Sequence, residues 1–132
     1  MKKYAICLLF IACAPQIMAQ TQLDLTNIQP YQDFDNVLIK SITDDSLTSS
    51  FVIWIKKEVK PHFHEHHIEQ VYVLEGTGTM IIDKTRLNIK PGQFFIIPKL
   101  SVHSVKVTSA KPLKVLSIQA PHFDGTDRIF VE

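Results

Sequence analysis

The chain has 132 residues, of which 14 are basic and 13 acidic, so its net charge is close to zero. Near-neutrality without any block of like charge gives no reason to expect a nucleic acid or an anionic membrane as partner. The length is enough for one compact domain with a hydrophobic core and too short for two.

The first residues have the parts of a secretory signal peptide. Lys2 and Lys3 precede an apolar run over residues 4–14, and small residues follow near Ala19. The run is shorter than the roughly 20 residues that a membrane-spanning helix needs. We therefore predict a signal peptide over residues 1–19, cleaved after Ala19, and a periplasmic or secreted protein.

A lipoprotein is the alternative to soluble export. The residues before Cys13 loosely resemble a lipobox, in which this cysteine would be acylated and would anchor the protein to a membrane. Phe10 and Ile11 fit that pattern poorly, so soluble export is preferred. Cys7 and Cys13 are the only cysteines and both lie in the predicted leader. The mature chain would therefore contain no disulfide, despite an oxidising compartment.

Residues 20–50 are polar and irregular, and we predict that they form an N-terminal arm packed on the domain, with one or two short strands. From residue 51 onward, short runs of β-branched and aromatic residues alternate with turn residues. These runs cover residues 51–55, 71–74, 80–82, 94–97, 105–107 and 115–118. Such spacing is typical of a β-sandwich or barrel, and no stretch after residue 20 sustains a helical period. We predict an all-β fold, with the barrel over residues 51–132.

Four of the six histidines lie between residues 61 and 69. Residues two apart on a strand point to the same face, so His62 and His64 would send two imidazoles into one space. His64 and His66 share this parity, but that pair leaves only two residues before Glu69. Glu69 begins the next predicted strand, after a short turn. Imidazoles with a carboxylate favour iron, manganese, nickel, cobalt or zinc.

The spacing of His62, His64, Glu69 and Gly76 resembles the first motif of the cupin family, and residues 98–103 (Pro-Lys-Leu-Ser-Val-His) resemble the second. The resemblance implies a single cupin-type β-barrel, also called a double-stranded β-helix or jelly roll. It further implies one divalent metal ion held by four ligands: His62, His64, Glu69 and His103. Two glycines of the family pattern are replaced here, by Lys56 and by Leu100.

The resemblance also implies a function that involves a small molecule. Dioxygenases, isomerases, lyases and sugar-processing cupins share this ligand set, so we predict a metal-dependent enzyme. The alternative is a non-catalytic periplasmic protein that binds a metal or a small ligand. His66 and His67 fall in a turn at the barrel mouth, either as exposed turn residues or as an acid or base beside the metal. Small cupins commonly pair through sheet edges, so a homodimer is expected.

Overall fold

The structure, a computed structural model, describes residues 21–131, so the predicted leader over residues 1–19 lies outside the described residues. Within these residues there are ten strands and no helix, and thus no helix long and apolar enough to cross a membrane. The predicted all-β class is confirmed. The strands are β1 (Val37–Asp44), β2 (Ser49–Ile55), β3 (Glu58–Phe63), β4 (Ile68–Glu75), β5 (Gly78–Ile82), β6 (Thr85–Ile89), β7 (Phe94–Ile97), β8 (His103–Val107), β9 (Leu113–Ala120) and β10 (Ile129–Phe130).

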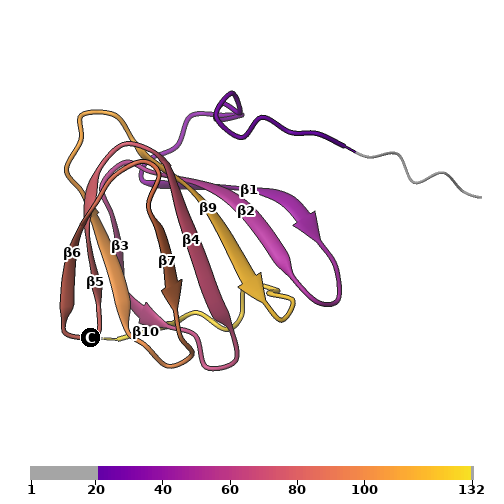
Figure 1. The fold of residues 1–132 in the computed structure, drawn as a ribbon, viewed down its shortest axis with the longest axis vertical. Coiled ribbons are helices and arrows are strands. Elements are labelled where there is room, and N and C mark those ends of the chain that lie inside the picture. The colour runs from indigo at the N-terminus through magenta and orange to yellow at the C-terminus, as the bar shows by residue number, and fades with distance from the viewer. Residues whose placement is uncertain (1–20, 132) are drawn as a thin grey trace, which may run out of the picture.

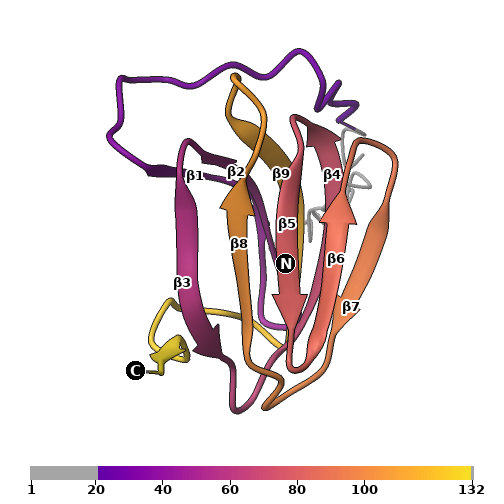
Figure 2. The same cartoon turned by 90° about the vertical axis from the view of Figure 1, so that its left-hand side faces the viewer.

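The strands form two five-stranded antiparallel sheets that face each other (Figure 1). Sheet A has the order β1-β2-β9-β4-β7, and sheet B has the order β10-β3-β8-β5-β6. Figure 2 shows β3, β8, β5 and β6 of sheet B in front of sheet A. Buried apolar side chains from both sheets, among them Val71, Met80 and Val105, form the core between them.

β2 has an apolar run without the alternation of a half-exposed strand, because both of its faces are covered. Ile53 and Ile55 belong to the core between the sheets, whereas Val52 and Trp54 belong to a second apolar cluster on the outer face of sheet A. Three residues that precede β1 cover this second cluster: Leu25, Ile28 and Phe34.

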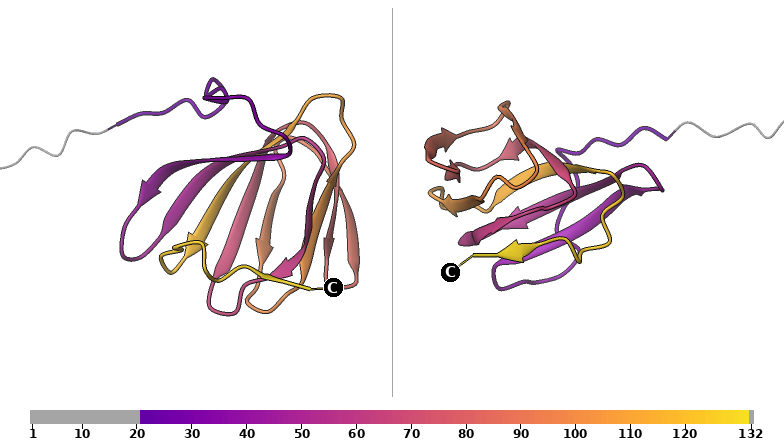
Figure 3. Two further views of the ribbon diagram at one scale, coloured as in Figure 1. Left: turned by 180° about the vertical axis from the view of Figure 1, so that it is seen from behind. Right: turned by 90° about the horizontal axis from the view of Figure 1, so that it is seen from below.

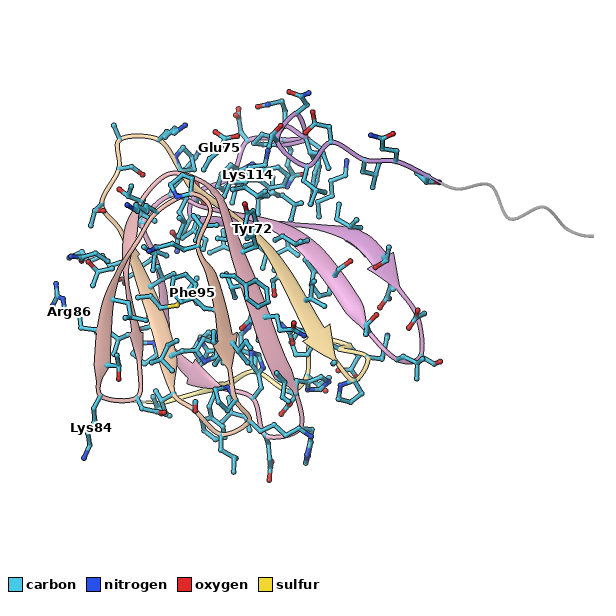
Figure 4. All side chains as sticks on the ribbon, viewed as in Figure 1. Tyr72, Glu75, Lys84, Arg86, Phe95 and Lys114 are labelled. Carbon is cyan, nitrogen blue, oxygen red and sulfur yellow. The ribbon has the colours of Figure 1, made fainter. Side chains whose placement is uncertain are left out.

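Lys114, at the start of β9, ties the N-terminal segment to sheet A. Its side chain is 2% exposed, and its ammonium group donates hydrogen bonds to the carbonyls of Thr26 at 2.9 Å and Ile28 at 2.7 Å. The carboxylate of Glu75 lies 3.5 Å away, and Figure 4 shows both side chains at the same end of the sandwich. The lysine is therefore buried with its charge paired and its donors used.

Besides β3, which the spacing of His62 and His64 predicts, three strands lie outside the apolar runs of the sequence: β1, β6 and β10. β1 falls inside the predicted arm and pairs with β2 along its length. β6 is mostly polar, but a two-residue turn over Asp83 and Lys84 joins it to β5 as a hairpin. Asp83 has φ 51°, in the left-handed region that such tight turns need.

The C-terminal segment crosses one end of the sandwich, at the bottom of Figure 1, and is seen from below in the right-hand view of Figure 3. Its last strand, β10, pairs with β3, so that Phe130 lies opposite His62. The end of β3 and the beginnings of β4 and β8 lie at this same end. Residues 121–131 are thereby placed beside the segments that carry the histidine cluster.

Candidate metal centre

Four side chains from three strands and one loop converge between the two sheets. His62 is on β3 and lies opposite His103, the first residue of β8. His64 follows the end of β3, and Glu69 reaches in from β4 of the facing sheet. All four are buried, and their ligand atoms lie within 4.8 Å of one another. The structure thus brings together the four residues that the sequence pattern marks as metal ligands.

Each of the three histidines is oriented by a backbone carbonyl at Nδ1. His62 Nδ1 donates to the Lys60 carbonyl at 2.9 Å, and His103 Nδ1 donates to the Ser101 carbonyl at 3.0 Å. His64 Nδ1 donates to the carbonyl of Asp127. A carbonyl oxygen only accepts, so each Nδ1 carries a proton and a neutral ring turns the lone pair of Nε2 inward. Hydrogen bonds of this kind orient histidine ligands in metal sites.

The inward-facing atoms fit a metal ion better than a proton. Nε2 of His103 lies 3.1 Å from a Glu69 carboxylate oxygen, which also only accepts when ionised. Nε2 of His64 lies 3.5 Å from the same oxygen, is buried, and has no hydrogen-bond partner among residues 21–131. A proton on His103 would satisfy one contact and leave His64 unsatisfied. A divalent cation would use all the converging lone pairs, and these four residues could hold one.

The surroundings of Glu69 and His62 shift their pKa values toward the protonation states that bind a metal ion. Burial alone would raise the pKa of Glu69, but its contacts with His103 and His64 hold that pKa below its usual range. The Ser117 hydroxyl, on β9, donates to the other Glu69 oxygen at 2.5 Å. Burial, and then the charge of His103, lower the pKa of His62 to about 4. At neutral pH His62 is therefore an uncharged imidazole and Glu69 a carboxylate, the forms that bind a metal.

A cavity of about 290 Å³ adjoins the cluster. His62, Glu69 and His103 form part of its wall, and apolar core residues from both sheets form most of the remainder. Arg128 and Phe130, from the C-terminal segment, also line it. The candidate ligands therefore face a space in which a small organic molecule would fit, as is usual for ligand sites.

The two histidines of the turn, His66 and His67, occupy different environments. The imidazole of His66 is exposed and lies 3.8 Å from the Glu65 carboxylate. His67 is buried, with Nδ1 against the Asp127 carboxylate and Nε2 2.8 Å from the His122 carbonyl. Neither histidine lines the cavity. Their acid or base role stays a prediction.

Sequence reasoning missed Asp127 and Ser117, which support the ligands. Besides contacting His67, the Asp127 carboxylate accepts the backbone N–H groups of Glu65 at 2.9 Å and His66 at 2.8 Å. It thereby fixes the loop that carries His64. Asp127 is about 60 residues from this loop in sequence, so no local pattern signals the contact.

Residues 51–119 match the model of the cupin domain, and the chain belongs to this family. An uncharacterized protein of Aquifex aeolicus is 34% identical over 84 residues, which cover 64% of this chain and 69% of that protein. A quercetin 2,3-dioxygenase of Bacillus subtilis is 42% identical over 48 residues, 36% of this chain but only 14% of the enzyme. An L-ectoine synthase of Aliivibrio fischeri is 27% identical over 89 residues, 65% of this chain and 70% of the enzyme.

Solved structures agree on the fold. A Klebsiella pneumoniae protein described as having a double-stranded β-helix domain superposes with a TM-score of 0.68. It is 16% identical, and the match covers 81% of this chain and 95% of that one. The predicted cupin-type barrel is therefore confirmed, and with it the family to which the two histidine motifs point.

Proposed function

We propose that this cupin is a metal-dependent enzyme that acts on a small organic molecule, in a reaction of the dioxygenase, isomerase or lyase type. The observation that carries the proposal is the position of three candidate ligands on the wall of the 290 Å³ cavity. A structural metal site is usually closed, whereas a catalytic site keeps room beside the ion. Here the cavity lies directly beside His62, Glu69 and His103 and is large enough for a small substrate.

His62, His64, Glu69 and His103 would hold one divalent ion: iron, manganese, nickel, cobalt or zinc. With three neutral imidazoles and one carboxylate, such an ion keeps a net charge near +1 and serves as a Lewis acid or activates water or dioxygen. The chain itself orients the ligands through the three Nδ1 contacts and Ser117. Apolar side chains form most of the cavity wall around them.

Two of the relatives bear the names of enzymes, a dioxygenase and a synthase, and this supports a catalytic role over simple binding. Their reactions differ, so the shared fold does not choose between the reaction types. A non-catalytic protein that binds a metal or small ligand is the competing function. It would use the same four ligands and show no turnover.

The test is an activity screen on metal-loaded protein, with oxygen consumption and isomer or elimination products as readouts and quercetin among the compounds. We expect turnover by the wild type, loss of turnover with His103→Ala, and unaltered turnover with His122→Ala. His122 is a matched control, because its partly exposed side chain lies outside the cluster and contacts Asp44. Stoichiometric metal without turnover of any compound would favour the non-catalytic function.

We also propose that the protein is exported, with residues 1–19 as the leader. Support comes from the two lysines, the short apolar run and Ala19 in the sequence. Mass spectrometry of the protein from a Gram-negative host's periplasm should give a mature chain that begins at Gln20. A chain that begins at an acylated Cys13 would identify the lipoprotein alternative, and an intact cytoplasmic chain would contradict export.

A further inference from the structure

Arg128 is a cation in the wall of the cavity beside the candidate metal ligands. It immediately precedes β10, whose pairing with β3 puts Phe130 opposite His62. Its guanidinium carbon lies 5.9 Å from the centre of the Phe123 ring, within the range of a cation–π contact. The fold thus sets a positive charge beside an otherwise mostly apolar space.

No acidic side chain among residues 21–131 pairs with Arg128. Its Nε is buried and has no hydrogen-bond partner in this part of the chain. A buried, unsatisfied donor on a charged group is destabilising, so such a donor is ordinarily matched by an acceptor. The other charged residues on the wall outside the metal cluster, Glu58 and Lys60, are exposed.

A second unsatisfied polar group lies close by. Arg128 also lines a neighbouring cavity of about 200 Å³, together with Phe123, Gln119 and the exposed Asp124, which forms no ion pair with Arg128. Gln119 is 1% exposed, and its side-chain oxygen has no hydrogen-bond partner within residues 21–131. A cationic donor and a neutral amide acceptor therefore border the same space, and both lack partners there.

We infer that the substrate of this site is a small hydroxycarboxylate with an apolar body, whose carboxylate binds Arg128 and whose hydroxyl donates to Gln119. This inference deepens the proposed function and rests on it. A guanidinium presents paired donors that match a carboxylate, and such charge-assisted contacts are about twice as strong as neutral ones. Arg128 is the less exposed of the two basic residues on the wall, since Lys60 is exposed, and it suits the carboxylate of a monoanion. The mostly apolar walls of the cavity suit the body of the molecule.

Calorimetry with three probes of one shape tests the inference: 2-hydroxy-3-phenylpropanoate, 3-phenylpropanoate and 2-hydroxy-3-phenylpropanamide. The first has both polar groups, the second lacks the hydroxyl, and the third lacks the charge. For the wild type we expect the amide to bind at least about tenfold more weakly than the hydroxycarboxylate. The compound without the hydroxyl should bind several-fold more weakly.

Variants assign these differences to residues. Arg128→Gln should remove the preference for the carboxylate, Arg128→Lys should retain part of it, and Gln119→Met should remove the preference for the hydroxyl. Arg86→Gln is the matched control, because Arg86 is an exposed arginine on β6 that points away from the sandwich in Figure 4. It should leave all three affinities unchanged.

Any of three results would overturn the inference. The wild type could bind the carboxylate and the amide equally, or bind all three probes with dissociation constants above about 10 mM. Arg128→Gln could also keep the wild-type preference for the carboxylate over the amide. Displacement of the hydroxycarboxylate by millimolar inorganic phosphate would overturn it in favour of a phosphate site. Elemental analysis of the same samples distinguishes failure of this inference from failure of the proposed metal-dependent function. Metal-free wild type that still prefers the carboxylate would refute the metal-dependent enzyme alone.

Discussion

His67 and Asp127 form a buried hydrogen-bonded pair directly behind the candidate metal ligand His64. Both side chains are 8% exposed, and the Asp127 backbone carbonyl accepts the Nδ1 proton of His64. One residue of the C-terminal segment thus contacts the ligand loop through its carboxylate and a ligand through its carbonyl. The sequence motifs of the cupin family do not include this contact.

Asp127→Asn should lower the free energy of unfolding of metal-free protein by about 2 kcal/mol. The carboxylate serves three N–H donors, from Glu65, His66 and His67, and an amide has a single oxygen with which to replace it. Urea denaturation measures the difference. Asp124→Asn is the control in the same segment, because Asp124 is exposed and, within residues 21–131, its carboxylate accepts hydrogen bonds only from Thr126. Equal effects of the two substitutions would contradict the role of Asp127.

The stabilisation by Asp127 should disappear in acid. Burial alone would raise its pKa, but the hydrogen bonds from His67, His66 and Glu65 lower that pKa from 3.8 to about 2. A group with a lowered folded-state pKa stabilises fully above its unfolded value and loses this effect as the pH falls through the folded value. The difference between wild type and Asp127→Asn should therefore narrow between pH 4 and pH 2. A constant difference over this range would contradict the assignment.

Leu100 occupies the left-handed region, with φ 67°, at the position where the second cupin motif has glycine. Its N–H donates to the His64 carbonyl at 2.8 Å, and its side chain is 62% exposed. Left-handed geometry costs a non-glycine residue about 1–2 kcal/mol, and glycine loses about 0.5–1 kcal/mol in unfolded-state entropy. Leu100→Gly should therefore raise the unfolding free energy by up to about 1 kcal/mol.

Leu100→Ala is the control for this substitution, because it removes the exposed side chain and keeps the strained backbone. Leu100→Ala should not raise the stability measured by thermal or urea denaturation. A marked loss of stability with Leu100→Gly would show that the leucine side chain is needed at this turn.

Gly76 ends the first motif, and its close packing against the connection between β8 and β9 explains why glycine stands there. It has φ 76°, and a Cβ atom would lie 2.7 Å from the Pro112 carbonyl oxygen and 2.9 Å from the Leu113 Cα. Gly92 has φ 87°, but no atom of residues 21–131 lies within 4 Å of a Cβ built there, so its substitution reports the backbone effect alone. Gly76→Ala should destabilise more than Gly92→Ala, by at least about 1 kcal/mol in urea denaturation. Equal losses of unfolding free energy in the two variants would mean that the backbone around Gly76 moves to accommodate a Cβ atom without destabilising the fold.

β7 is an edge strand of sheet A with apolar side chains on its outer face. Phe94 is 51% and Ile96 61% exposed, and Tyr72 of β4 pairs with Phe94. Such an edge favours pairing with a second copy. We expect a homodimer in light scattering, and dissociation with Ile96→Lys but not with Leu47→Lys, a change at an exposed residue between β1 and β2. A monomeric wild type, or a dimeric Ile96→Lys variant, would rule out this interface.

The residues that sequence reasoning identified are those whose signal is local. Strand runs and the spacing of His62, His64 and Glu69 depend on backbone periodicity, and His103 followed from the resemblance of its motif. Asp127, Ser117 and Arg128 are missed, because the path of the C-terminal segment and the register of β9 bring them to the site. Polar β6 is missed for a similar reason, since its pairing with β5 makes it a strand.

The burial of His67 is likewise not predictable from the local sequence. Its position in a turn is consistent with exposure, but His67 is 7% exposed and contacts His122, Phe123 and Asp127 of the C-terminal segment. Lys114 is also indistinguishable in sequence from a surface lysine, although the carbonyls of the N-terminal segment surround its ammonium group.

The metal content of the purified protein decides whether His62, His64, Glu69 and His103 form a metal site. Gently purified wild-type protein should contain one equivalent of a divalent metal by elemental analysis. Readdition to the stripped protein should raise its melting temperature, since binding to the folded state stabilises it. Glu69→Ala and His103→Ala should lose both the metal and the shift, whereas His122→Ala should keep them. Wild-type protein that contains no metal, and whose melting temperature does not rise with iron, manganese, nickel, cobalt or zinc, would show that these four residues do not bind a metal ion.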